Sequence, residues 1–255
     1  MTPMAWHIII TGASSGLGRA LALEFARRGA NLGLIARRGE LLATLADEVR
    51  ELGVEASWAA ADVVDEAQVG AAVTSLEEEL GPCDVMIANA GISGRETPGH
   101  INVSTLREVM AVNYFGAANS AAAVIPNMRS RKSGQLVVVS SIAGFRGLPK
   151  SGAYCSSKAA ISNLWESLRI ELAPFGISCT TILPGYVETP LTDKNRHPMP
   201  FIITAADAAI IMVDGILANK RELVFPWQWR AVMAIVKRLP TWAYDWLMRR
   251  MNGMR

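Results

Sequence analysis

Cysteine and charge are both scarce in this chain of 255 residues, of which three are cysteines and 19% are charged. Cys83, Cys155 and Cys179 form no C-x-x-C pair and have no histidine cluster nearby, so the sequence encodes neither a disulfide framework nor a metal site. We therefore expect a reducing compartment, the cytoplasm. Lysine and arginine number 25 against 23 aspartates and glutamates, and this balance excludes a protein that binds nucleic acid over its whole surface.

The sequence also lacks a segment suited to span a membrane. Its longest uncharged stretch, residues 109–128, contains three asparagines and a proline. A spanning helix needs about 20 predominantly apolar residues, so we interpret this stretch as a helix packed inside an α/β protein. The first ten residues show neither a basic leader nor a small-residue cleavage site, and we expect no signal peptide.

Hydrophobic residues make up 51% of the chain, which excludes intrinsic disorder. Short apolar runs alternate with longer segments that repeat apolar residues at helical spacing. The runs predict seven strands, at residues 6–10, 31–35, 55–60, 84–88, 135–139, 178–182 and 222–225. The segments between them predict helices over 18–28, 39–52, 65–80, 103–129, 152–173 and 205–217.

This alternation predicts one doubly wound Rossmann domain of α/β class, with a seven-stranded parallel sheet flanked by helices. We place the domain at residues 1–226, because no linker or repeat interrupts it. Ligands of such sheets bind beyond the carboxyl ends of the strands. Functional residues are therefore expected just after strands.

A glycine-rich loop follows the first predicted strand and reads Thr-Gly-Ala-Ser-Ser-Gly-Leu-Gly over residues 11–18. Glycines here let the backbone approach a pyrophosphate, whose charge is stabilised by the N–H groups that begin the next helix. The spacing Gly-x-x-x-Gly-x-Gly differs from the usual Gly-x-Gly-x-x-Gly fingerprint, so the loop alone also fits a simple tight turn.

The residues after the next strands bear on the cofactor. Ala36 supplies no carboxylate for an adenosine ribose, whereas the guanidinium of Arg37 suits a 2′-phosphate, so NADP is favoured over NAD. Arg38 is interpreted as a solvated surface charge. Asp62 could accept a hydrogen bond from the adenine amino group, and Asn89-Ala90-Gly91 suits a tight turn beside the cofactor.

Tyr154 and Lys158 are four residues apart in a predicted helix, so their side chains share one face. A free phenol has a pKa of about 10, too high for a proton acceptor near neutral pH. The Lys158 ammonium and the nicotinium ring of a bound cofactor are expected to share in lowering it. Tyr-x-x-x-Lys arises often by chance, so the pair indicates a catalytic site only together with the other motifs.

Together, and in this order, the motifs resemble those of the classical short-chain dehydrogenases/reductases, over residues 5 to about 225. The matching segments are 11–18, Asp62-Val63, Asn89-Ala90-Gly91, Asn113, Ser140-Ser141, 154–158 and 184–189. The resemblance implies a catalytic tetrad of Asn113, Ser141, Tyr154 and Lys158. Ser141 is chosen over Ser140 because the family's serine lies 13 residues before the tyrosine, and 154 − 141 = 13.

The resemblance also implies the role of each residue. Tyr154 exchanges a proton with the substrate oxygen, which Ser141 hydrogen-bonds. Lys158 holds the nicotinamide ribose and lowers the phenol pKa, and Asn113 positions a water that links Lys158 to solvent. The implied cofactor contacts are Gly12, Ser14, Ser15, Gly16, Leu17, Gly18, Arg37, Asp62, Val63, Asn89, Ala90, Gly91, Tyr154, Lys158, Pro184, Gly185, Val187 and Thr189.

The expected function is an NADP(H)-dependent oxidoreductase for a hydrophobic ketone or aldehyde, or the corresponding secondary alcohol, without a metal. The alternative is a non-catalytic NADP(H)-binding regulator or scaffold, against which the complete tetrad argues. The resemblance implies a homodimer or homotetramer, joined through the helices that end near residues 129 and 173. The pocket is expected to be mostly apolar, lined by Ile92, Ser93, Ile142, Phe145, Leu148, Tyr186 and Val187.

The tail at residues 227–255 differs from the rest of the chain. Residues 220–255 hold eight basic and two acidic residues, a net charge of 8 − 2 = +6, and four of the seven tryptophans. Two amphipathic helices are predicted, separated at Pro240, with Thr241 capping the second. They touch a membrane surface, or they pack on the domain and cap the substrate pocket and the dimer. The first helix should present one apolar face, made of Trp229, Val232, Met233, Val236 and Leu239.

Overall fold

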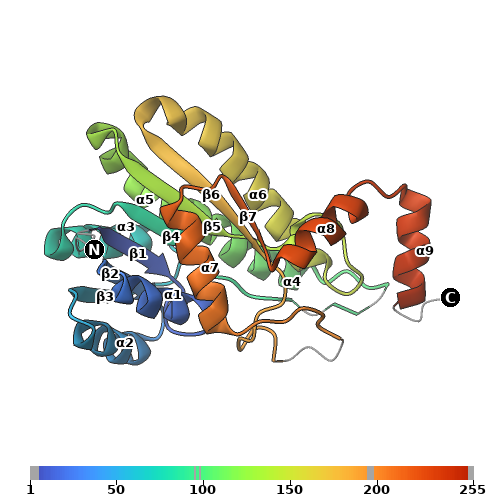
Figure 1. Cartoon of the computed structure of the whole chain (residues 1–255), viewed down its shortest axis with the longest axis horizontal. Helices are drawn as coiled ribbons and strands as arrows, with labels where there is room; N and C mark the ends of the chain where they lie inside the picture. The colour runs from blue at the N-terminus through green and yellow to red at the C-terminus, as the bar shows by residue number, and fades with distance from the viewer. Residues whose placement is uncertain (1–5, 95, 98, 194–197, 252–255) are drawn as a thin grey trace.

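A seven-stranded parallel sheet organises the computed structural model, which describes residues 6–94, 96–97, 99–193 and 198–251. The strand order is β3-β2-β1-β4-β5-β6-β7, and the predicted doubly wound fold is thereby confirmed (Figure 1). Each strand lies within two residues of its predicted position. The strands are β1 (His7–Thr11), β2 (Asn31–Ala36), β3 (Ala56–Ala60), β4 (Val85–Ala88), β5 (Gly134–Val139), β6 (Ile177–Pro184) and β7 (Glu222–Phe225).

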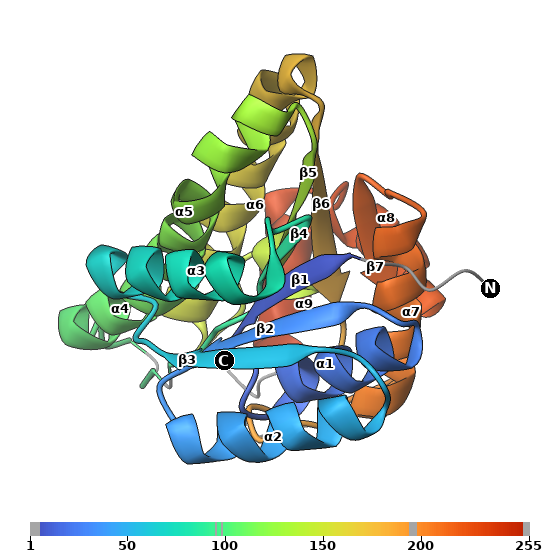
Figure 2. The same ribbon diagram turned by 90° about the vertical axis from the view of Figure 1, so that its left-hand side faces the viewer.

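Helices cover both faces of the sheet (Figure 2). α1 (Gly16–Arg27), α2 (Gly39–Glu51) and α7 (Ala205–Leu217) share one buried cluster with Ile8 and Ile10 of β1. Ile9, between them, joins the cluster on the other face. Alternate side chains of a strand point to opposite faces, so a strand buried on both sides is apolar throughout. The second cluster includes residues of α3 (Glu66–Leu80), α5 (Gly116–Arg131) and α6 (Gly152–Leu172).

The helix predicted over residues 103–129 is confirmed as a continuous helical segment, but it is not one regular α-helix. The structure has α4 (Val103–Met110), a π-helical turn η1 (Ala111–Phe115) and then α5. A π turn adds one residue within a helix, and the apolar spacing on either side of it remains helical, so periodicity alone does not reveal it. Asn113 lies at the centre of this turn.

The strand order reverses between β1 and β4, which pair in parallel although β2 and β3 separate them in the chain. The loops that follow these two strands therefore lie side by side at the carboxyl edge of the sheet. The Asn89 side-chain amide donates to the Thr11 carbonyl oxygen at 3.0 Å and joins the two loops. This edge is where ligands of doubly wound sheets bind.

The tail forms the two predicted helices, α8 (Trp227–Val236) and α9 (Thr241–Met251). The predicted apolar face of α8 is partly buried, and its Trp229 contacts residues that follow β6. The tryptophans of α9 point outward, since Trp242 is 75% and Trp246 60% exposed. None of the helices in the described part of the chain is long and apolar enough to cross a bilayer.

Candidate active site

The fold brings the four predicted tetrad residues together at the carboxyl edge of β4 and β5. Ser141 follows β5, Tyr154 and Lys158 lie on α6, and Asn113 lies in η1. The Lys158 Nζ is 5.7 Å from the centroid of the Tyr154 ring. A Cβ built on Gly91 would lie 3.3 Å from the Asn113 Oδ1 and 3.5 Å from the Lys158 Nζ, so both side chains converge on this glycine.

The π turn fixes Asn113 between two other segments. Its side-chain amide donates to the Ile92 carbonyl oxygen at 2.9 Å and to the Ser157 Oγ at 3.0 Å, while its Oδ1 accepts from the Ile92 N–H at 2.8 Å. Asn113 is 1% exposed. The side chain thus holds the loop after β4 against α6, and π turns are often found at such functional positions.

The two adjacent serines after β5 face different partners. The Ser140 Oγ donates to the Lys158 carbonyl oxygen at 2.9 Å and lies 2.8 Å from the Ser162 Oγ. The Ser141 hydroxyl accepts from the Ala143 N–H at 3.1 Å, and its side chain interacts with the Tyr154 phenol so as to lower the phenol pKa. Ser141 is therefore the serine next to the phenol, and its catalytic role stays a prediction.

Burial controls the protonation of both titratable tetrad residues. It raises the pKa of the Tyr154 phenol to about 12, although the interaction with Ser141 acts in the opposite direction. Burial also lowers the pKa of the Lys158 ammonium to about 8. The phenol thus holds its proton at neutral pH. The expected lowering of the phenol pKa, which Lys158 would share with the nicotinium ring of a bound cofactor, stays a prediction.

The glycine loop has the shape of a dinucleotide cradle. Gly12 has a φ of +68°, and a Cβ there would lie 2.8 Å from the Cα of Ala90. A Cβ on Gly18 would collide with the Gly12 carbonyl oxygen. Because α1 begins at Gly16, its first N–H groups lie at the loop and favour an anion there. The residues present therefore fit the pyrophosphate of a dinucleotide.

Two arginines lie beside this cradle. Arg38 is exposed, in agreement with the interpretation of a solvated surface charge, but its guanidinium also donates to the Ser14 and Ser15 hydroxyls, both at 2.9 Å. Arg37 has a side chain 71% exposed, with its Nη1 3.8 Å from an Asp62 carboxylate oxygen. A pair of guanidinium groups thus borders the loop, and the sequence pattern singled out only one of them.

The segment after β6 completes the cofactor side of the site. A Cβ on Gly16 would lie 3.4 Å from the Thr189 side chain, which places Thr189 against the glycine loop. Val187 is 3% exposed and belongs to the core cluster that includes residues of α7. Its side chain therefore does not line the substrate pocket as expected, and any cofactor contact of Val187 would be through its backbone.

A family model described as short chain dehydrogenase matches residues 6–200 of this sequence. The chain belongs to this family. An uncharacterized oxidoreductase of Myxococcus xanthus (strain DK1622) is 40% identical over 244 residues, which are 96% of this chain and 96% of the relative. Membership places the chain among oxidoreductases that bind a nicotinamide cofactor and act on small molecules.

Solved structures share the fold. A short-chain dehydrogenase/reductase from Burkholderia phymatum in complex with NAD has a TM-score of 0.84 and 24% identity, covering 92% of this chain and 94% of its own. An alcohol dehydrogenase from the archaeon Thermococcus sibiricus, complexed with 5-hydroxy-NADP, has a TM-score of 0.78 and 28% identity, covering 86% and 95%. The dinucleotides differ between these two structures, so the choice of cofactor has to be argued from the residues.

An aromatic cluster packs α8 against the segment that follows β6. The Trp229 ring of α8 makes edge contacts with Tyr186 and Phe201, each with 5.9 Å between centroids, and packs against Gly185. The sequence pattern placed Trp229 only on the apolar face of a tail helix. Its contact with Tyr186, a residue predicted to line the substrate pocket, joins segments about 40 residues apart in the chain and is not encoded by a local pattern.

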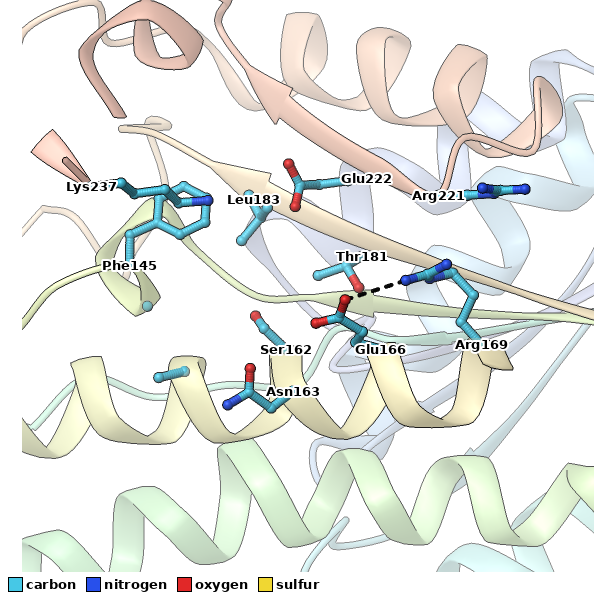
Figure 3. A pocket seen from close by; sticks show the side chains of 12 residues that line it. Phe145, Ser162, Asn163, Glu166, Arg169, Thr181, Leu183, Arg221, Glu222 and Lys237 are labelled. Atoms are coloured by element: carbon cyan, nitrogen blue, oxygen red, sulfur yellow. Dashed lines mark hydrogen bonds and ion pairs between the residues drawn. The ribbon is translucent and has the colours of Figure 1, made fainter. Parts of the chain in front are cut away.

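A groove of about 540 Å³ lies between α6, the last two strands and Lys237, which follows α8 (Figure 3). Among the described residues that line it are Glu166 and Arg169, paired at 3.4 Å, but no tetrad member. Phe145, expected in the substrate pocket, lines this groove instead, with its ring centroid 3.5 Å from the Lys237 Nζ. Phe145 directly follows the 3-10 turn η2 (Ile142–Gly144), which starts after Ser141.

The helix that carries Tyr154 is capped by a residue from a distant loop. The Glu96 carboxylate accepts from the Gly152 N–H at 2.8 Å and from the Ala153 N–H at 2.6 Å. Sequence reasoning missed Glu96 because it lies 56 residues away from these groups, and Ser151, the local candidate, does not cap the helix in the described structure.

Replacing Glu96 by alanine is expected to destabilise the protein by about 0.5–2 kcal/mol and to reduce turnover, because the first N–H groups of α6 would lose their partner directly before Tyr154. Urea unfolding and steady-state kinetics measure the two effects. Glu96→Gln, which keeps one acceptor oxygen, should lose less. Glu108→Ala, at an exposed position of α4, is the control. A Glu96→Ala protein as stable as this control would disprove the cap.

Proposed function

We propose that this chain is an NADP(H)-dependent oxidoreductase that interconverts a hydrophobic ketone or aldehyde and the corresponding alcohol. The observation that carries the proposal is the convergence of Ser141, Tyr154 and Lys158, with Asn113 behind them, at the strand edge that also holds the glycine loop. A protein that only bound the dinucleotide would have no use for a phenol in this position. The cofactor supplies the hydride, and the protein orients the reactants.

The proposed roles follow from the contacts. Tyr154 donates its proton to the substrate oxygen during carbonyl reduction, and the raised pKa of its phenol keeps that proton available at neutral pH. Ser141 hydrogen-bonds the same oxygen and stabilises the charge that develops on it. Lys158, anchored by donating to the Val139 carbonyl oxygen at 2.8 Å, holds the nicotinamide ribose. The Asn113 amide is already engaged, so the backbone of its π turn is proposed to hold the relay water.

The proposed preference for NADP(H) depends on Arg37 and Arg38. A 2′-phosphate beside the end of β2 would lie near both guanidinium groups, and Arg38 is already held over the loop by Ser14 and Ser15. Guanidinium groups suit phosphate oxygens because their donors are planar and their charge is permanent. Asp62, near Arg37, is proposed to accept from the adenine amino group.

Removing either arginine should selectively weaken NADPH. In Arg37→Ala and in Arg38→Ala, the loss of a charge-assisted contact predicts an affinity for NADPH about 10- to 150-fold lower. Affinity for NADH should change much less, since it has no 2′-phosphate. Fluorescence titration of both cofactors measures this, with Arg107→Ala on α4 as the matched control. If both variants keep the affinity of the control for NADPH, the proposed phosphate site is wrong.

A mostly apolar substrate is supported by the aromatic cluster of Tyr186, Phe201 and Trp229. Reduction is the proposed direction, because cells generally keep NADP reduced and the phenol is protonated. A screen of ketones and aldehydes for NADPH oxidation tests the proposed function as a whole. Turnover of no carbonyl compound by a protein that binds NADPH would favour the regulator or scaffold instead.

The proposed function includes an oligomeric state and a cellular compartment for the protein. We propose a homodimer or homotetramer joined through α5 and α6, near which Phe115 remains 55% exposed. Ala117 and Ala121 serve packing within the chain, since both are buried in the core. The cytoplasm is supported by Cys83, Cys155 and Cys179, which are free and buried.

A further inference from the structure

The outer face of α9 combines large apolar side chains with positive charge. Trp242 and Trp246 are one turn apart and are 75% and 60% exposed. Arg249 and Arg250 follow one turn later and are also exposed, and the Arg250 guanidinium lies 5.6 Å from the centroid of the Trp246 ring. These four residues are here called the outer face of α9. Figure 1 shows this helix at one end of the molecule, away from the sheet.

The tryptophans are not exposed because the helix is loose. The opposite side of α9 is docked: Tyr244 is 7% exposed, and its hydroxyl donates to the Gly147 carbonyl oxygen at 2.6 Å. The Arg146 guanidinium lies 4.1 Å from the centroid of the Tyr244 ring. Arg146 also donates to the carbonyl oxygens of Val236 and Leu239, at 3.2 and 3.1 Å. α9 is thus fixed in an orientation that turns its tryptophans to solvent.

α8 repeats the pattern. Its inner side packs through Trp229, whereas Trp227 and Ile235 are 73% and 65% exposed. Arg230 and Arg238 are exposed as well. An ordinary surface helix places its apolar residues inward and its polar residues outward. The inner side of each tail helix packs on the domain, and large apolar residues are still exposed on its outer side.

The charge of the tail indicates what could cover this surface. Residues 227–251 include one acidic residue, Asp245, and five basic ones, which are Arg230, Lys237, Arg238, Arg249 and Arg250. A second copy of the chain would bring the same positive charge against it, which opposes association. Tryptophan beside arginine suits the headgroup region of an anionic bilayer, where the ring lies at the interface and the guanidinium groups meet phosphate.

We propose that the outer face of α9, together with Trp227 and Ile235, docks on the surface of an anionic lipid bilayer without spanning it. This inference goes beyond the oxidoreductase activity and does not depend on it. The docked surface is tied through Arg146 and Gly147 to the loop between Ser141 and Tyr154. The bilayer would thereby lie on the side of the protein where an apolar substrate reaches the phenol.

Vesicle flotation with the full chain tests the proposal. Wild-type protein should float with vesicles of phosphatidylcholine containing phosphatidylglycerol. It should remain in the bottom fraction when the vesicles are phosphatidylcholine alone, or when the salt concentration is high. Trp242→Ser with Trp246→Ser should abolish flotation. Arg249→Gln with Arg250→Gln should lower partition about 30-fold, because each basic residue contributes about a fivefold factor near an anionic surface.

Matched controls separate docking from folding and from general charge. Trp58→Ser removes a tryptophan that is 38% exposed on β3, and Arg107→Gln with Lys132→Gln removes two exposed basic residues elsewhere. Both control proteins should float like wild type, and circular dichroism should show the same helix content in every variant. The proposal is overturned if wild-type protein remains in the bottom fraction when anionic vesicles are present. It is also overturned if the tail substitutions leave flotation unchanged. A lower mass of the tryptophan variant in sedimentation without lipid would also overturn it, because the face would then join subunits.

Discussion

Replacing Tyr154 by phenylalanine is expected to abolish measurable turnover while leaving NADPH affinity nearly unchanged. A positioned general acid contributes about 10²- to 10⁴-fold, and the substitution removes only the hydroxyl that supplies the proton. The phenol is neutral at pH 7, since burial raises its pKa to about 12. The substitution therefore leaves the charge of the cofactor site unchanged, which isolates proton transfer from binding.

Steady-state kinetics and NADPH titration of the same preparation measure the two quantities. Tyr114→Phe is a suitable control, because it makes the same chemical change within η1. Tyr154→Phe protein that keeps a tenth or more of wild-type turnover would show that another group supplies the proton. Joint loss of turnover and NADPH affinity would instead assign Tyr154 a binding role.

Replacing Ser141 by alanine is expected to lower kcat by about 100-fold or more, as removal of one donor to a developing oxyanion usually does. Ser140→Ala is a matched control one residue away. Its hydroxyl bonds the Lys158 carbonyl oxygen and Ser162 within α6, so its loss should cost about 1 kcal/mol of stability and little activity. Ser141→Ala should therefore change kcat, whereas Ser140→Ala should change the free energy of unfolding.

Kinetic constants and urea unfolding of both variants check this separation. Equal losses of kcat in Ser140→Ala and Ser141→Ala would contradict the assignment, since the Ser140 hydroxyl is engaged by Lys158 and Ser162 and only Ser141 affects the phenol. A loss of kcat in Ser141→Ala that disappears at saturating substrate would also contradict it, because a group acting in the transition state lowers kcat itself.

The sheet was predictable from the sequence because a parallel sheet buries both faces of each strand. Ile8, Ile9 and Ile10 belong alternately to the two core clusters, so a continuous apolar run marks the strand. The π turn at Asn113 was not predictable in this way. Its extra residue leaves the apolar spacing on either side helical, and the partners of Asn113, Ile92 and Ser157, lie far away in the sequence.

The parts of the candidate site that are encoded by short sequence motifs were predictable. Tyr154 and Lys158 meet because they are one helical turn apart, and the glycine loop follows directly after β1. The contacts of Glu96, Arg38 and Trp229 were missed because each is made with a distant segment. Glu96 caps a helix 56 residues further on, and no local pattern encodes such a pairing.

The burial of the tetrad was not predictable from the sequence for a related reason. The sequence places an ammonium one turn from a phenol, and this proximity alone predicts a lower phenol pKa. It does not reveal that both groups are buried, which raises the pKa of Tyr154 and lowers that of Lys158. Activation of the phenol for alcohol oxidation would therefore require the positive charge of an oxidised nicotinamide in addition to Lys158.

The central claim is that the carbonyl carbon receives a hydride from NADPH beside Tyr154. Its most direct test is mass spectrometry of the alcohol formed from a hydrophobic ketone by wild-type enzyme and NADPH deuterated at nicotinamide C4. The account predicts that one stereospecifically labelled preparation delivers one deuterium to the carbinol carbon and the other delivers none. An alcohol without deuterium from both preparations, although NADPH is bound, would contradict direct hydride transfer at this site.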